Sequence, residues 1–213
     1  KIQNENDKLM EINKILADDR RRYAELSLTN SKATSKTMSL LSYLVYNQEE
    51  SPPLKEISHE QIKAICNKNE DKGIPFAKTL LFHNKNKCLH KFIGDMIISV
   101  YKKDDKAIQA LHSTDCSRLN YIIMDIVGDN KEWIHDNGGV KVSDRIINPI
   151  LKDVRQTIYD HSMKLLDSEG YINKETRENI YSVFDQIDDA KLHKQISIYI
   201  APYFKTLRQE YSE

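Results

Sequence analysis

HSTDCSRLNYIIMDIVGDNKEWIHDNGGVKVSDRIINPIL, residues 112–151, is the stretch of the chain on which the fold depends. It holds the only tryptophan, a Gly-Gly pair and a proline among apolar residues, namely Trp133, Gly138, Gly139 and Pro149. We interpret these four as structural anchors: a large aromatic plug, a turn and a helix boundary. None of them indicates a reaction.

The first part of this stretch predicts a helix over residues 115–127. Ser113, Thr114 and Asp115 are all good N-cap residues, and Gly128 is a typical C-terminal residue. Between them lies a broad apolar face, made of Leu119, Ile122, Ile123, Ile126 and Val127. We expect this helix to be buried.

The segment EWIHDNGGVKV then predicts a small β-hairpin near residues 131–143. Two short strands would flank the turn at Gly138 and Gly139. An isolated hairpin is only marginally stable and needs packing support. Trp133 is the expected anchor that holds it to the helices.

Helical periodicity dominates the rest of the chain. A long helix capped by Ser143 or Asp144 should run to about Leu166, either starting or kinking at Pro149. Ser58 and Gln61 have the spacing of a capping box. Further helices are predicted over residues 38–47, 58–67, 75–82, 87–103, 174–187 and 190–200. The sequence therefore predicts an all-α fold with one hairpin.

The N-terminal sequence has the pattern of a coiled-coil stalk. Apolar residues occupy the a and d positions of a heptad pattern, in a stripe too narrow to pack firmly on a globular core. The predicted oligomerisation residues are Ile2, Leu9, Ile12, Leu16, Tyr23 and Leu26. We expect a coiled-coil helix at residues 1–30, pairing as a dimer or trimer, and an all-α globular domain at residues 31–213. A lone amphipathic helix lying on its own domain is the alternative.

The composition excludes several classes of partner. Lys plus Arg equals Asp plus Glu at 32 each, so no net field draws the chain to nucleic acid or anionic lipid. Apolar runs are far shorter than the roughly 20 residues that span a bilayer, so no membrane partner is expected. Three cysteines, Cys66, Cys88 and Cys116, make a disulfide framework improbable and favour a reducing compartment.

A metal site is the most specific chemical alternative. His83, Cys88 and His90 are close in sequence, and His112 and Cys116 are one helical turn apart. Their spacing matches no common zinc module, and cysteines beside apolar helix faces are typically buried in the core. We therefore expect no metal and no cofactor.

Catalytic motifs are absent from the sequence. It contains no Gly-rich phosphate loop, no H-E-x-x-H, no G-x-S-x-G and no recognised nucleophile motif around a cysteine. We predict a non-enzymatic protein without catalytic residues. A site assembled from distant residues is the remaining enzymatic alternative.

Nucleic-acid binding has one structural argument. A helix over residues 115–127 followed by a hairpin has the order of a winged-helix module. This segment offers Arg118, Lys131 and Lys141 among acidic neighbours, too little basic density for phosphate contacts. Nucleic acid is therefore an alternative partner that we do not favour.

Several runs resemble a family of giant DNA virus proteins of uncharacterised function, from mimivirus-like and related cytoplasmic viruses. The similar runs are TDCSRLNYII, WIHDNGGVKV, IINPIL, KATSKTMSLLSYLV, SPPL and HKFIGDMIISVYKKDD, which together cover about residues 30–160. The family's domain often follows a zinc finger and a coiled coil; no such finger is present in this sequence. Where the family usually reads TDTSRL, this chain has Cys116. The family supplies no catalytic residues to transfer.

These observations favour one function. We predict a viral interaction or scaffold protein that homo-oligomerises through its N-terminal coiled coil and binds an unknown protein partner. The resemblance implies the host cytoplasm, at the viral factory, as its location. The alternative is a nucleic-acid-binding regulator of a giant virus.

Overall fold

The computed structural model describes residues 32–58, 60–62, 64 and 75–205. The chain divides into two compact units, Lys1–Glu49 and Glu50–Glu213. In the first unit, α2 (Lys32–Asn47) contains the helix predicted at residues 38–47. The predicted coiled-coil helix, with all six of its oligomerisation residues, lies outside the described residues.

Most helices of the second unit follow the predicted periodicity. They are α4 (Phe76–Lys85), α5 (Leu89–Tyr101), α8 (Lys174–Asp188) and α9 (Lys191–Ile200). The capping box is confirmed as well: the Ser58 backbone N–H donates to Oε1 of Gln61 at 2.9 Å, and the Gln61 N–H donates to Oγ of Ser58 at 3.2 Å. These two bonds satisfy backbone donors that a helix start otherwise leaves unpaired.

The all-α prediction is wrong, because this unit contains a three-stranded antiparallel sheet. Its strands are β1 (Leu111–Asp115), β2 (Asn120–Val127) and β3 (Asn130–Asp136), in the order β1-β2-β3. The segment that was predicted as a helix over residues 115–127 is a turn followed by β2. The fold is therefore mixed, with helices built around a small sheet.

Burial on both sides of β2 explains the error. Tyr121 and Ile123 pack in the main core, while Ile122 and Met124, which point to the other face, are equally buried. A strand that is apolar on both faces has no polar alternation in its sequence. Such a run cannot be distinguished from a buried helix by periodicity alone.

The hairpin predicted near residues 131–143 is also misplaced. The observed hairpin joins β2 to β3 through Gly128 and Asp129, and pairs Val127 with Asn130. Gly138 and Gly139 have φ of +70° and +69°, and they lead from β3 into helix rather than back into a strand. Left-handed backbone of this kind favours glycine.

The long predicted helix forms, as the last two of four joined helical segments. A 3-10 turn (Asn137–Gly139) leads into α6 (Val140–Val142), then a π-helical segment (Ser143–Ile147), then α7 (Asn148–Glu169). Pro149 occupies the first turn of α7 and has no N–H to donate. A π-helical turn directly before a proline is one of the known ways in which a helix accommodates it.

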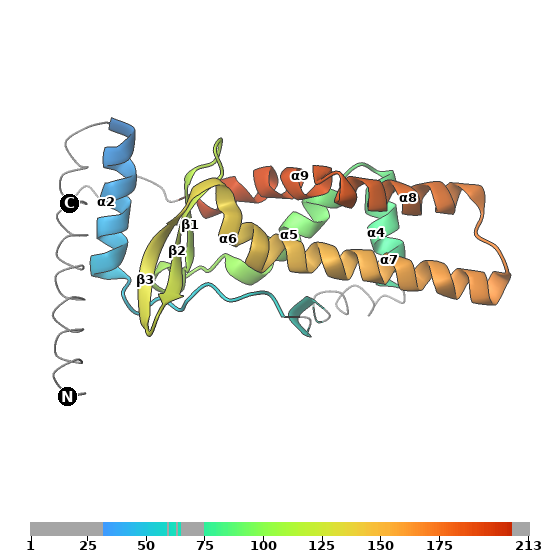
Figure 1. Ribbon diagram of the computed structural model, residues 1–213, viewed down its shortest axis with the longest axis horizontal. Helices are drawn as coiled ribbons and strands as arrows, with labels where there is room; N and C mark the ends of the chain where they lie inside the picture. The colour runs from blue at the N-terminus through green and yellow to red at the C-terminus, as the bar shows by residue number, and fades with distance from the viewer. Residues whose placement is uncertain (1–31, 59, 63, 65–74, 206–213) are drawn as a thin grey trace, which may run out of the picture. The chain divides into compact units, whose positions relative to one another are not determined.

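Within the second unit the sheet lies at one end of the long helices, and α7 and α8 run side by side as an antiparallel pair (Figure 1). Helix α9 follows α8 and packs on α5. Beyond α9, a 3-10 turn (Ala201–Phe204) brings Lys205 to a parallel bridge with Ser113 on β1. The core contains residues from the sheet and from α4, α5, α7, α8 and α9.

Candidate protein-interaction surface

The helical hairpin formed by α7 and α8 presents the most distinctive exposed surface of the described residues. Its inner side is fixed by buried residues, which are Ile150, Leu151, Val154 and Ile158 on α7 and Ile180 and Val183 on α8. Gly170 ends α7 at φ +72°, with its N–H donating to the carbonyl of Leu166. Asn173 then caps α8 by accepting the Thr176 N–H at 2.9 Å.

An ion pair aligns the two helices. The Arg155 guanidinium on α7 pairs with the Asp188 carboxylate on α8, and it lies 5.2 Å from the ring centroid of Phe184. Because α7 and α8 are antiparallel, equal steps from this pair toward the connecting loop bring residues to the same level. Seven residues, or two helical turns, lead from Arg155 to Ser162 and from Asp188 to Tyr181.

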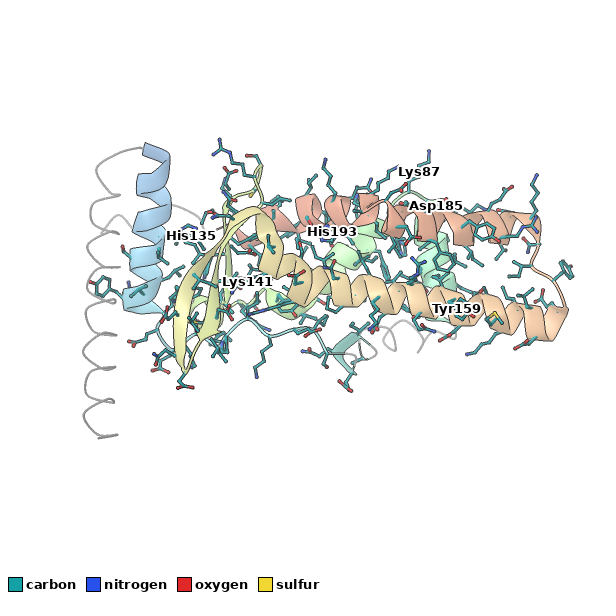
Figure 2. All side chains as sticks on the ribbon, in the orientation of Figure 1. Lys87, His135, Lys141, Tyr159, Asp185 and His193 are labelled. Atoms are coloured by element: carbon teal, nitrogen blue, oxygen red, sulfur yellow. The ribbon has the colours of Figure 1, made fainter. Side chains whose placement is uncertain are left out.

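Large apolar side chains follow the same side of the hairpin. Tyr159, Met163 and Leu166 recur at helical spacing on α7, and Tyr181 lies on the side of α8 that carries Asp188. Their exposed fractions are 51% for Tyr159, 40% for Met163, 41% for Leu166 and 58% for Tyr181. We call these four residues the hairpin face; Tyr159 is labelled on α7 in Figure 2. Several exposed apolar side chains on one side of a helical pair mark a binding surface more often than a single exposed residue does.

A groove borders the hairpin where α4 meets it. It has a volume of about 500 Å³, and charged and apolar residues line it together, among them Lys78, Phe82, Lys85, His161 and Glu175. Lys85 and Glu175 pair across it. Burial, and then the nearby Lys78 and Lys164, lower the pKa of His161 from its ordinary value.

A second groove, of about 670 Å³, lies between α4, α8 and the start of α9. At its base, Asn84 donates to Oδ1 of Asn179 at 2.7 Å and accepts from Nε2 of Gln186 at 2.8 Å. Ser182 lies within hydrogen-bonding distance of both Asn84 and Gln186. Buried polar groups of this kind must be paired, and here they pair with each other to hold α4 on α8.

The residues considered for a metal site do not come together as one group. Nδ1 of His83 is 3.3 Å from Sγ of Cys88, and the His83 ring stacks on Phe92 with centroids 4.3 Å apart. His90 instead meets the ring of Tyr199. Among the described residues, no three His, Cys, Asp or Glu side chains converge as a metal site would require.

His112 and Cys116 are likewise engaged apart from each other. Nε2 of His112 is 3.1 Å from the carbonyl oxygen of Gln109, and Sγ of Cys116 is 3.4 Å from Oγ of Ser113. The helical spacing that suggested a shared site does not apply, because His112 lies on β1 and Cys116 lies in the turn after it.

Of the predicted anchor residues, Gly138 and Gly139 lie where β3 leads into the helices, whereas Trp133 lies on the face of the sheet opposite the main core. Trp133 is buried on β3, opposite Met124, with its ring 5.5 Å from that of His112. Gly138 donates its N–H to Oδ1 of Asn120 at 2.9 Å. A β-carbon on Gly139 would stand 3.0 Å from the Tyr121 ring, which is a tight contact, and the positive φ of this residue also favours glycine.

A buried carboxylate joins the same region together. Asp125 on β2 pairs with Arg145 at 2.7 Å and with Lys141, and it accepts the Ile126 N–H at 2.8 Å. Burial alone would raise the pKa of Asp125, but the bonds from Arg145, Lys141 and Ile126 outweigh it and lower the pKa to about 2. Arg145 also donates to the carbonyl of Leu54 at 3.1 Å, so that this cluster connects the sheet, the π-helical segment and the preceding loop.

The winged-helix order proposed for nucleic-acid contact is not present at residues 115–142, because a strand occupies the place of the recognition helix. Among the described residues, no helix is long and apolar enough to cross a membrane. Comparison of the chain with protein-family models, curated proteins and solved structures finds no match to any of them.

The hairpin face was not predicted from the sequence, although a signal for it exists. Tyr159, Met163 and Leu166 are spaced by four and three residues, but they are offset around the helix from the buried stripe at Leu151, Val154 and Ile158. A second apolar stripe on one helix predicts a second contact, and here no described residue covers it fully.

Proposed function

We propose that this chain is a non-enzymatic interaction or scaffold protein, in which the hairpin face docks against a protein surface. The observation that carries the proposal is the exposure of Tyr159, Met163, Leu166 and Tyr181 along one side of a rigid helical pair. Tyrosine and methionine are enriched in protein interfaces. A surface built on two packed helices also loses little conformational freedom when it binds.

The N-terminal coiled coil belongs to the same proposal. Pairing through Ile2, Leu9, Ile12, Leu16, Tyr23 and Leu26 would join two or three copies and so present several hairpin faces at once. The viral origin and the location in the host cytoplasm rest on the sequence resemblance alone, and they extend the proposal.

Site-specific photocrosslinking tests the docking. A benzophenone amino acid replaces Tyr159 in the full chain, and irradiation in the producing cell is expected to give covalent adducts with protein. The matched control carries the same group in place of Ile198, which is similarly exposed at 54% but lies on α9. Tyr181→Asp in the crosslinking chain should abolish the adduct, because it places a charge in the middle of the apolar face.

The outcomes separate clearly. An adduct that Tyr159 gives, that the Ile198 position lacks and that Tyr181→Asp removes supports docking at this face. Equal adducts at both positions, or none at Tyr159, would contradict the proposal.

For the stalk, Leu9→Glu with Leu16→Glu is expected to reduce the solution mass of the full chain, measured by sedimentation equilibrium. An unchanged mass would remove the coiled coil from the proposal.

A further inference from the structure

We infer that the occupant of the hairpin face is a second copy of this chain, docked with α7 on α7 and α8 on α8 in antiparallel directions. The inference rests on the proposed function, since it names the partner of the same face. It places a two-fold axis at Tyr181, so that the same surface serves both copies. Such isologous contacts are the commonest way in which soluble proteins pair.

The charges of α8 are arranged symmetrically for this pairing. Arg177 and Asp185 are each four residues from Tyr181, one toward each end of the helix, and both are exposed. Within the described part of the chain, neither forms an ion pair or a side-chain hydrogen bond. When two copies of α8 meet in antiparallel directions at Tyr181, Arg177 of each copy faces Asp185 of the other. Two such ion pairs, related by the two-fold axis, then form between the copies.

The same axis also relates α7 of the two copies. The Arg155–Asp188 pair sets Ser162 level with Tyr181, so the axis crosses α7 at Ser162. Tyr159 then lies within one residue rise, about 1.5 Å, of the level of Leu166 in the second copy, and Met163 packs close to its own counterpart. One rotation therefore brings apolar residues together on α7 and opposite charges together on α8.

The size of the face predicts a weak contact. Fifteen residues of α8 span about 22 Å, and two packed helices are about 20 Å wide, so each copy presents roughly 400 Å². The total of about 800 Å² is below the roughly 1,200 Å² that stable complexes usually bury. Self-association through this face should therefore depend on concentration, and a coiled-coil tether would strengthen it by raising the local concentration.

Charge exchange tests the pairing directly. The background is the full chain with Leu9→Glu and Leu16→Glu, so that the stalk does not contribute. Sedimentation velocity over a concentration series gives the dimer dissociation constant. Arg177→Asp alone and Asp185→Arg alone are each expected to weaken the dimer at least tenfold, because each places like charges opposite one another. The double variant restores opposite charges and should return to within about threefold of the background.

The control is Lys194→Asp on α9, which changes the net charge as Arg177→Asp does, at an exposed position outside the face. It should leave the dissociation constant unchanged. The inference is overturned if the single exchanges have no effect, if the double variant is not restored, or if the background chain stays monomeric throughout the series.

The crosslinking experiment separates this inference from the proposed function. An adduct at Tyr159 with a second copy of this chain supports both. An adduct with a different protein supports docking at the face and overturns self-pairing. No adduct overturns both.

Discussion

Gly94 on α5 lies directly against the ring of Tyr199 on α9: a β-carbon on Gly94 would stand 2.3 Å from Cδ1 of Tyr199. The ring is held in place, because the Tyr199 hydroxyl donates to Oδ1 of Asp95 at 2.8 Å. Glycine at this position is therefore what allows the two helices to approach so closely.

Gly94→Ala is expected to destabilise the protein by about 2 kcal/mol, measured by urea unfolding. Alanine favours a helix by about 1 kcal/mol over glycine, so the propensity term alone would predict the opposite sign. Overpacking a tight contact typically costs about 1–3 kcal/mol and more when the neighbour cannot move. The steric cost at Gly94 should therefore exceed the gain in helix propensity.

Removal of the ring provides the control. Tyr199→Ala costs stability in the natural chain, but it makes room for a side chain at position 94, so Gly94→Ala should cost nothing in the Tyr199→Ala background. A loss that is equal in both backgrounds would show that the contact with Tyr199 is not its cause.

Asp125 should make stability depend on pH in the acid range. Its pKa is about 2 in the folded chain, below the ordinary value of 3.8, so its contribution is fully present above about pH 4. The contribution is lost as the pH falls from 4 through 2, since the folded state then has to take up a proton. A difference of nearly 2 pH units corresponds to about 2 kcal/mol.

Asp125→Asn tests this dependence. Its unfolding free energy should lie below that of the natural chain by about 2 kcal/mol at pH 6, and the difference should shrink as the pH approaches 2. Asp129→Asn, in the exposed β2–β3 turn, is the control and should show a constant small difference. If the gap at Asp125 stays the same from pH 6 to pH 2, the ion pairs with Arg145 and Lys141 do not lower its pKa.

The helices of the second unit were predictable because apolar residues recur along them at helical spacing. Ile93, Met96 and Ile97 on α5 recur at three and four residues, and all are buried. At Ser58 the capping box gave the local start of a helix. These signals are contained within a few neighbouring residues, so a single sequence is enough to recognise them.

The sheet was not predictable by the same reasoning, for two physical reasons. Ile122 and Ile123 point to opposite faces of β2 and are both fully buried, which removes the alternation that identifies a strand. Asp125 is a polar residue in this run, and it was compatible with a helix until its partners Lys141 and Arg145 were known. Only the long-range pairing of β2 with β1 and β3 distinguishes a strand from a helix in this segment.

Asp136, the last residue of β3, caps the helix that follows the sheet. Its Oδ1 accepts the N–H of Lys141 at 2.9 Å and its Oδ2 accepts the N–H of Val142 at 3.0 Å. These donors belong to α6, which starts directly after the two left-handed glycines. A buried carboxylate thus caps the helix from the last residue of β3.

Asp136→Asn should cost about 1–2 kcal/mol of unfolding free energy, because the amide can accept only one of the two N–H bonds and turns a donor toward the other. The exposed Asp144→Asn is the comparison and should cost less than about 0.5 kcal/mol. Equal effects of the two substitutions in urea unfolding would contradict the capping role of Asp136.

We expect that replacing Tyr121 by phenylalanine does not destabilise the protein. Its hydroxyl is buried and has no hydrogen-bond partner among the described residues, and burial is the main reason why its pKa is raised above its ordinary value. A buried hydroxyl without a partner costs about 1–3 kcal/mol of desolvation. Tyr121→Phe removes this cost and keeps the ring that packs on Gly139, so the unfolding free energy should stay the same or rise by about 1 kcal/mol.

Tyr101→Phe is the matched comparison, since its hydroxyl donates to the carbonyl of Lys55 at 2.9 Å. Losing that bond should cost about 1 kcal/mol, which gives the two Tyr→Phe substitutions opposite signs in the same urea titration. If Tyr121→Phe costs as much as Tyr101→Phe, the Tyr121 hydroxyl is bonded in solution, and a buried water between β2 and Gly139 is then the group that satisfies it.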